Sequence, residues 1–296
     1  MNTPTPQGQQ GSTNLAKYRI RAEVDWIETE VTTASPTNFQ TVKRWGGFNY
    51  VEPMHPGPGG ATSTYRLRLQ APRNCEYVRA RLIQLASRIP LAIEPTIVGV
   101  EVSLDAYSRH GLHSDLVEMA ARWATGLTTL VSKNRRFSGR RKGDVVASIS
   151  STETRALLSQ DRVYFVGDRD ADLTQRIYVK CKDDSVVLHS HKHRARVEVT
   201  MRNEALGAST LTDWGFFQFE SLATYFRFRK QKAGLDLFLA HAMQRSVQIG
   251  ERKSRLRAGG GTRVFGKGST ADITLNKAAR DALRELSRRW AHQPGT

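Results

Sequence analysis

The chain has 296 residues, and 45 Lys or Arg against 28 Asp or Glu give it a formal net charge of +17. Such an excess indicates a polyanionic partner, with nucleic acid as the first candidate and an anionic membrane surface as the weaker one. No apolar run approaches the ~20 residues that cross a bilayer. Two cysteines form no disulfide framework and are compatible with a reducing compartment. Composition therefore predicts a cytoplasmic protein with no membrane partner.

The N-terminal segment 1–15 consists mainly of Gln, Gly, Thr, Pro and Asn, which predicts a disordered leader. From Tyr18 to Val31 apolar and polar residues alternate, as expected for a strand with one buried face. The expected inner residues are Ile20, Ala22, Val24 and Trp26, opposite Arg19, Arg21, Glu23 and Asp25.

A Pro/Gly-rich loop follows between residues 53 and 60, and a second alternating strand covers residues 65–70. Helical spacing of apolar residues after Asn74, a residue type that caps helices, predicts the first helix. A third strand runs from Ile97 to Leu104, and a longer amphipathic helix begins near Ser114.

Three more strands are predicted between residues 162 and 202. In the last two, Ile177 and Val197 share one face, whereas Tyr178 and Glu198 share the other. Strands with one charged face are typical of antiparallel sheets that are covered by helices on one side only. Residues 16–205 are therefore predicted to form an α+β domain, an antiparallel sheet with helices on one face and an open polar face.

The remaining region, 206–296, becomes helical and more basic. From residue 221 onward it holds 16 Lys or Arg and 5 Asp or Glu. A helix is expected near 235–248, and a final helix is expected to carry Leu283, Leu286 and Trp290 on one side. We interpret this region as a basic helical DNA-binding region.

Carboxylates and a tyrosine gather on the predicted polar face. Glu101 and Asp105 are four residues apart in one strand, so both point to the same side. Carboxylate oxygens suit Mg²⁺ or Mn²⁺, although solvated residues paired with arginines would show the same spacing. A nearby cation would favour the phenolate of Tyr178, which makes Tyr178 with Lys180 a candidate catalytic pair.

The basic loop from residue 133 to residue 142 is predicted to clamp phosphates, and arginines on the polar face add to it. These DNA-binding candidates are Arg135, Arg136, Arg140, Arg141, Lys142, Arg176, Arg194 and Arg196. Two other patterns are rejected. The stretch 261–268 lacks the Ser or Thr of a nucleotide-binding loop, and the histidines at 189, 191 and 193 fit a surface loop better than a metal site.

These residues resemble the Rep-trans type of replication initiation factor, found in rolling-circle plasmids and filamentous phages. The resemblance lies in the order of three pieces over roughly residues 22–205. They are Tyr164-Phe165-Val166-Gly167, Arg176-Ile177-Tyr178-Val179-Lys180 and Arg196-Val197-Glu198, preceded by the strand 98–105 and by Val24-Asp25-Trp26. Val179 departs from the family pattern, which has Asp or Asn there, and Glu101 stands where Asp is common.

The resemblance implies a DNA-nicking and rejoining enzyme that starts rolling-circle replication through a 5′-phosphotyrosine. Tyr178 would be the nucleophile, with Tyr164 in reserve, and Glu101, Asp105 and Glu198 would bind Mg²⁺ or Mn²⁺. Arg176, Lys180 and Arg196 would hold phosphates. The expected partner is DNA, as a single strand or an origin duplex, and further candidates are a host helicase, a polymerase and a second copy of the chain as a homodimer.

Two alternatives stay open at this point. A non-catalytic protein could coat nucleic acid with the same charged face and basic tail, and its binding would be steeply salt-dependent but indifferent to EDTA. A related recombinase or transposase would use the same tyrosine chemistry.

Overall fold

The fold was analysed in a computed structural model that describes residues 14–128, 135–138, 145–146, 151–168, 171–183, 185–231 and 269–291. Three sequence-based expectations lie wholly or largely outside these ranges. They are the leader 1–15, the basic loop 133–142, of which only residues 135–138 are described, and the helix near 235–248.

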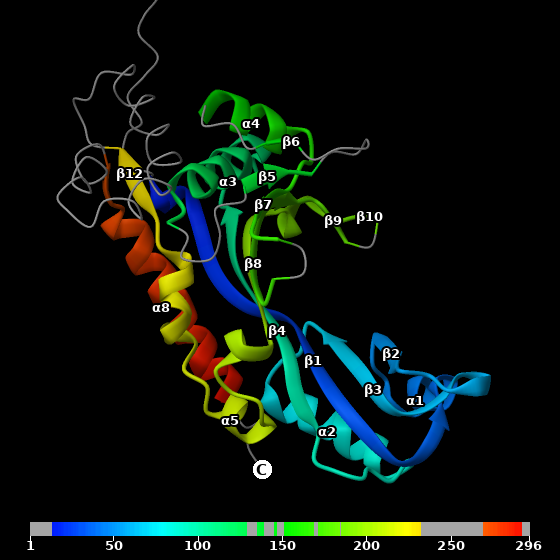
Figure 1. The fold of residues 1–296 in the computed structure, drawn as a ribbon. Helices are drawn as coiled ribbons and strands as arrows, with labels where there is room; N and C mark the ends of the chain where they lie inside the picture. Colours follow the sequence, from blue (N-terminus) through cyan, green and yellow to red (C-terminus); the bar gives the residue numbers. More distant parts are fainter. Residues whose placement is uncertain are drawn as a thin grey trace, which may run out of the picture.

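A nine-stranded sheet organises the chain, in the order β2-β3-β1-β4-β11-β8-β7-β5-β6 (Figure 1). Every neighbouring pair in it is antiparallel. Its strands are β1 (Tyr18–Asn38), β2 (Tyr50–Met54), β3 (Ala61–Gln70), β4 (Thr96–Ser108), β5 (Arg135–Phe137), β6 (Val145–Val146), β7 (Tyr164–Val166), β8 (Leu173–Lys180) and β11 (Arg194–Arg202). Two small hairpins pair β9 (Lys182–Asp183) with β10 (Val186–Val187) and β12 (Arg229–Gln231) with β13 (Ser269–Ala271).

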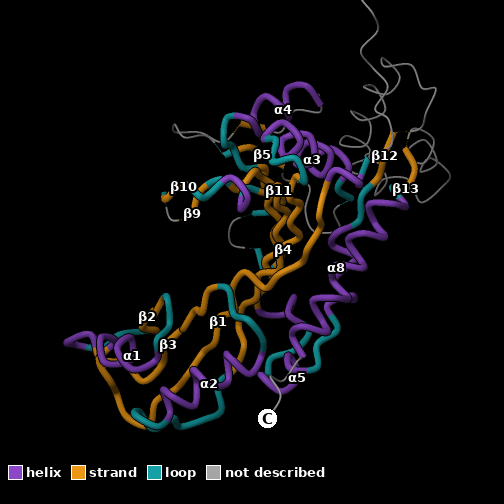
Figure 2. Tube along the Cα trace, turned by 180° about the vertical axis from the view of Figure 1, so that it is seen from behind, coloured by secondary structure: helices purple, strands orange, loops and turns teal. Residues whose placement is uncertain are grey.

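Helices accompany the sheet, as Figure 2 shows from behind. The α-helices are α1 (Phe39–Gly46), α2 (Cys75–Ala86), α3 (His113–Gly126), α4 (Ser151–Ser159), α5 (Leu211–Gly215) and α8 (Ile273–Ala291). Short 3₁₀ turns are η1 (Leu15–Lys17), η2 (Pro58–Gly60), η3 (Ser190–Lys192), η4 (Asn203–Leu206) and η5 (Phe219–Phe226). The predicted α+β class is confirmed. Within the described residues, no helix combines the length and the apolar character that a membrane crossing requires.

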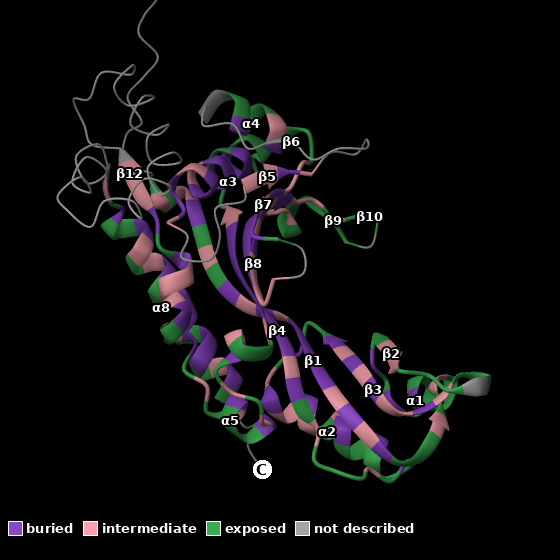
Figure 3. Cartoon of the chain, viewed as in Figure 1, coloured by how far each residue is buried: buried purple, intermediate pink, exposed green. Residues whose placement is uncertain are grey.

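The core lies between the apolar face of the central strands and the helices. Val102 of β4 pairs with Val199 of β11, and Val197 pairs with Ile177 of β8, so these side chains share one face. Helix α3 packs against β4, β8 and β11, and its Trp123 belongs to the same buried cluster. Buried residues follow the middle of the sheet, while the outer sides of the helices are exposed (Figure 3).

Strand β1 is the long strand that links the two ends of the sheet (Figure 1). It contains a bulge at Asp25, because Val24 pairs with Val102 and the next paired residue is Trp26, opposite Glu101. A one-residue bulge reverses the facing of everything beyond it. Trp26 therefore lies on the polar side with Glu101, and the expectation that it shares the inner face of Val24 is wrong.

Two elements in the N-terminal part were not expected from the sequence. Strand β2 includes Pro53, in the stretch interpreted as a loop, and Pro is tolerated there because β2 lies at the edge of the sheet. Helix α1 begins after Asn38, whose side chain accepts a hydrogen bond from the Gln40 N–H at 2.9 Å. It ends at Gly47, which has a φ of 61°.

The last helix packs on the sheet rather than standing apart from it. Helix α8 contacts β1 and η5, and Arg289 donates a hydrogen bond from Nη2 to the Ala22 carbonyl at 2.5 Å. Trp290 is buried against Phe219 and donates from its indole N–H to the Trp214 carbonyl at 2.8 Å. Strand β3 pairs with β1 only from Trp26 onward, so the part of β1 before Trp26 has β4 as its only partner among the described strands. Helix α8 contacts that part of β1 at Ala22. The proposed boundary near residue 205 stays a prediction.

Candidate active site

Three strands bring the polar residues of the site into adjacent rows. In one row, Asp105 of β4 lies opposite Arg196 of β11, which lies opposite Tyr178 of β8. In the next row, Glu198 lies opposite Arg176. Directly opposed residues of an antiparallel sheet share a face with Cβ atoms about 5 Å apart. The strand pairing therefore brings these five side chains together on one face of the sheet.

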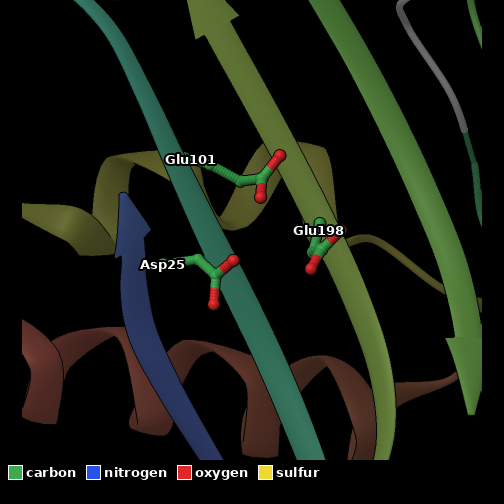
Figure 4. A group of neighbouring side chains, drawn as sticks. All are labelled: Asp25, Glu101 and Glu198. Carbon is green, nitrogen blue, oxygen red and sulfur yellow. The ribbon is translucent and has the colours of Figure 1, made fainter. Parts of the chain in front are cut away.

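Three carboxylates from neighbouring strands converge on this face. Asp25 of β1, Glu101 of β4 and Glu198 of β11 each place one carboxylate oxygen within 4.8 Å of the others (Figure 4). The Asp25 side chain joins them from the β1 bulge, whose backbone is held by a 2.7 Å hydrogen bond from the Ala71 N–H to the Asp25 carbonyl. Bulges often redirect a side chain next to a functional site.

The phenol of Tyr178 is bonded to this group. Its hydroxyl donates a hydrogen bond to Oε1 of Glu198 at 2.6 Å. Burial, together with the negative charge of Glu198, raises the pKa of Tyr178 far above that of a free phenol. Tyr178 is thus a neutral phenol whose proton already points at a carboxylate acceptor.

Arg196 is the fixed cation of the site. It is fully buried and binds Asp105 with two parallel hydrogen bonds, Nε to Oδ1 at 2.6 Å and Nη2 to Oδ2 at 2.7 Å. Its Nη1 also contacts Asp25 at 2.5 Å and Glu198 at 3.4 Å. Burial disfavours the charged guanidinium, but Asp105 and Asp25 outweigh it and raise the pKa of Arg196.

Arg176 makes a second set of ion pairs on the solvent side. Its Nη2 lies 2.9 Å from both carboxylate oxygens of Glu101 and 2.7 Å from Oε2 of Glu198. The side chain of Arg176 is 37% exposed, whereas both glutamates are 1% exposed. Arg176 thus closes the glutamate pair from outside.

The carboxylates differ in their affinity for protons. Burial, reinforced by the charge of Glu198, raises the pKa of Glu101 to about 7. Burial also opposes the ionisation of Asp25, but Arg196 and Lys180 together lower the pKa of that residue. Four carboxylates of the site, with Asp105 included, pair with three arginines, and Lys180 adds a fourth positive charge near Asp25.

This group could hold a divalent metal ion. All its donors are carboxylate oxygens, which hard cations prefer. Oε2 of Glu198 is buried and accepts no hydrogen bond of normal geometry, although Arg176 lies near it. Buried carboxylate atoms with unused acceptor capacity are what a further cation would satisfy.

The group of three converging carboxylates differs from the predicted metal set in one member. Asp105 lies on the same face but belongs to the arginine network, since Arg196 takes both its oxygens and Arg194 approaches Oδ2 at 3.1 Å. Asp25 takes its place in the carboxylate group. The motif Val24-Asp25-Trp26 signalled this strand, but alternation alone did not assign Asp25 to the site.

The reserve nucleophile lies elsewhere. Tyr164 of β7 pairs with Ile177, so it faces the apolar side of the sheet, where it is buried with its ring edge-on to Phe137 at 5.1 Å. Burial raises the pKa of Tyr164 as well. Because the carboxylates lie on the opposite face, its position gives no support to a role for Tyr164 in the same chemistry.

The predicted DNA-binding residues lie in three places, which are the polar face of the sheet, its opposite face, and the part of the chain outside the described residues. Arg136 lies on the polar face, with its guanidinium 5.4 Å from the centre of the Phe165 ring. Phe165 lies between Arg136 and Arg176 in the same row of the sheet. Arg135 pairs with Val166 and faces the other way. Arg194 lies on the polar face beside Tyr107. Lys180 forms an ion pair with Asp183 at 2.9 Å. Arg140, Arg141 and Lys142 lie outside the described residues.

Fold and site together define an α+β protein with a buried acidic centre, clamped by arginines and joined to one tyrosine. No family model matches the chain, and no curated protein matches it. Among solved structures, it is similar to a rolling-circle replication initiator protein from Geobacillus stearothermophilus. The two are 14% identical with a TM-score of 0.37, over 74% of this chain and 90% of that chain.

Proposed function

We propose that the chain is a rolling-circle replication initiator that nicks and rejoins one DNA strand through a phosphotyrosine at Tyr178. The observation that carries the proposal is the 2.6 Å hydrogen bond from Tyr178 to Glu198, which itself belongs to the three-carboxylate group. A nucleophile bonded to a base, with the base held by further groups, is the arrangement that activated nucleophiles share.

In the proposed step, the phenol oxygen of Tyr178 attacks a backbone phosphorus while Glu198 takes the phenol proton. The bond from phosphorus to the 3′ oxygen breaks, and that oxygen leaves as a hydroxyl after accepting a proton from water. The 5′ phosphate stays on Tyr178 as a diester. Because one phosphodiester replaces another, the reverse attack by a 3′-hydroxyl rejoins the strand without a nucleotide cofactor.

Asp25, Glu101 and Glu198 would hold Mg²⁺ or Mn²⁺ in this enzyme. When bound, the ion would supply positive charge that stabilises the phosphate and lowers the pKa of a nearby phenol. Arg196, locked on Asp105, keeps Asp25 and Glu198 in place. Positive charge on the polar face and in the C-terminal region would bind the DNA backbone, consistent with the net charge of +17.

A covalent adduct tests the proposal directly. A pool of single-stranded oligonucleotides of random sequence is incubated with the protein and Mn²⁺, and the products are separated in SDS. A 3′-end label should remain on the protein, because Tyr178 keeps the fragment downstream of the nick, whereas a 5′-end label should be released. Tyr178→Phe should abolish the adduct. Tyr107→Phe is the matched control, since Tyr107 lies on the same face but bonds to Asp105 at 3.5 Å.

A persistent adduct in Tyr178→Phe would contradict the assignment of the nucleophile. Absence of any adduct in the wild-type protein, with the target sequence represented in the pool, would instead favour a protein that only coats DNA. The buried ion pairs of Arg194 and Arg196 with Asp105 favour this DNA-coating function, because such arginine–carboxylate networks also occur as purely structural features. Such a protein would bind DNA equally with Mn²⁺ or EDTA.

A further inference from the structure

The two central arginines of the site are held very differently. Arg196 uses Nε, Nη1 and Nη2 in hydrogen bonds, and its side chain is 1% exposed. Arg176 contacts its two glutamates through Nη2 alone, and its Nε makes no hydrogen bond. Arg196 is therefore a permanent part of the core, whereas Arg176 is attached at one atom and reaches solvent.

The contact atom of Arg176 occupies the solvent side of the carboxylate group. Its Nη2 contacts both oxygens of Glu101 and one oxygen of Glu198. These two glutamates are members of the three-carboxylate group. A divalent cation bound to Asp25, Glu101 and Glu198 would lie within a few ångströms of this guanidinium. At a few ångströms, the repulsion between two cations is worth several kcal/mol even with partial screening.

We propose that Arg176 is an exchangeable resident cation, which neutralises Glu101 and Glu198 until a divalent metal ion displaces it. The displaced guanidinium then binds a DNA phosphate, a step that rests on the proposed function. Its neighbours in the ladder fit this second position, because Phe165 and Arg136 continue the same row of the sheet away from the glutamates. By reciprocity of linked equilibria, metal binding would raise the affinity for DNA through this one side chain.

Metal binding without DNA tests the exchange itself. The free Mn²⁺ signal is followed by electron paramagnetic resonance during titration of the full-length wild-type, Arg176→Ala and Arg194→Ala proteins. Removal of the competing guanidinium should tighten Mn²⁺ binding at least about tenfold in Arg176→Ala. Arg194→Ala is the matched control, since Arg194 pairs with Asp105 outside the three-carboxylate group. It should change the Mn²⁺ affinity much less.

Weaker or unchanged Mn²⁺ binding in Arg176→Ala would overturn the exchange. If that variant does not fold without metal, Arg176→Gln introduces a shorter, neutral side chain that can still donate hydrogen bonds, and the same tightening is expected. Equal tightening in Arg194→Ala would also count against the proposal, because it would reduce the effect to general electrostatics.

The DNA half is tested separately in a Tyr178→Phe background, in which the proposed adduct cannot form. Binding of a single-stranded oligonucleotide is measured against salt, with Ca²⁺ or Mn²⁺ compared with EDTA. With metal, DNA affinity should fall more steeply with salt concentration in the protein that has Arg176, by the amount expected for about one additional phosphate contact. In the Arg176→Ala protein, metal should leave this slope unchanged. No difference between these proteins would refute the second position. Mn²⁺ tightening without any nicking by the wild type would leave the exchange standing and the proposed function refuted.

Discussion

The hydroxyl of Tyr178 donates a hydrogen bond to Oε1 of Glu198, with 2.6 Å between the oxygens, and both side chains lie on the polar face of adjacent strands. The register places Arg196, not Glu198, directly opposite Tyr178, so the contact is diagonal. Diagonal neighbours in a sheet come within reach only for long or aromatic side chains. A tyrosine and a glutamate satisfy that requirement, whereas a shorter acid at 198 would not reach the phenol.

Replacement of the acceptor should separate binding from chemistry. In Glu198→Gln the amide cannot take the phenol proton, so adduct formation should fall by about 10²- to 10⁴-fold, the usual contribution of a general base. Oligonucleotide affinity measured in EDTA should change little, because the proposed metal is then absent from both proteins. Rates of adduct formation and DNA affinities measured side by side check this expectation. A variant that forms adduct at the wild-type rate would remove Glu198 from the step.

Metal-free stability should depend on pH through Glu101. Its pKa is raised from 4.5 to about 7, so between these values the folded state holds a proton that the unfolded chain has released. The stabilisation is therefore complete below the ordinary carboxyl pKa and is lost as the pH rises through about 7. The loss is on the order of 3 kcal/mol.

Urea unfolding in EDTA between about pH 4.5 and pH 8 measures this loss. Glu101→Gln carries no titrating group at this position, so its unfolding free energy should vary less over the same range. Parallel curves for the two proteins would show that Glu101 titrates normally.

Loss of Asp105 should destabilise the fold itself. Asp105→Asn leaves the buried Arg196 guanidinium without its two-point partner, and breaking a buried ion pair from one side costs about 3 to 5 kcal/mol. Asp183→Asn is the surface control, because the ion pair of Asp183 with Lys180 involves an aspartate that is 63% exposed. That change should cost less than about 1 kcal/mol. Equal unfolding midpoints for both variants would argue that Asp105 does not anchor Arg196.

The C-terminal helix should unfold together with the sheet. Trp290→Ala empties a buried site next to Phe219 and should lower the unfolding free energy by about 3 to 5 kcal/mol. Arg288→Ala in the same helix removes a side chain that is 72% exposed and should be nearly neutral. Fluorescence and circular dichroism should report one shared transition. Two separate transitions would mean that α8 belongs to an independent unit.

Alternation along the chain was sufficient to predict the central strands and their faces. Ile177 and Val197 are buried on one side, and Tyr178 and Glu198 meet on the other, because a strand has a strict period of two. The helix after Asn74 was equally accessible, since Asn74 caps it through a 2.8 Å bond from the Tyr77 N–H. Local rules acting within a few residues carried these predictions.

Pairing between distant strands was not accessible in the same way. Alternation shows which face a residue takes but not which residue lies opposite, so it left Asp105 and Asp25 undistinguished as ligands. The bulge at Asp25 breaks the period without a Gly or Pro to mark it. Strand β2 was missed for a related reason, because Pro53 excludes a central strand but not an edge strand.

The single extra residue in β1 adds a carboxylate to the polar face without disturbing the ladder on either side of it. Val24 lies opposite Val102 and Trp26 lies opposite Glu101, so deletion of Asp25 alone would leave a regular, continuous register and remove only the carboxylate. A strand of strict period two has no position from which a second side chain joins the face that Trp26 already takes. Chains that share this site should therefore keep one unpaired residue at this point of β1.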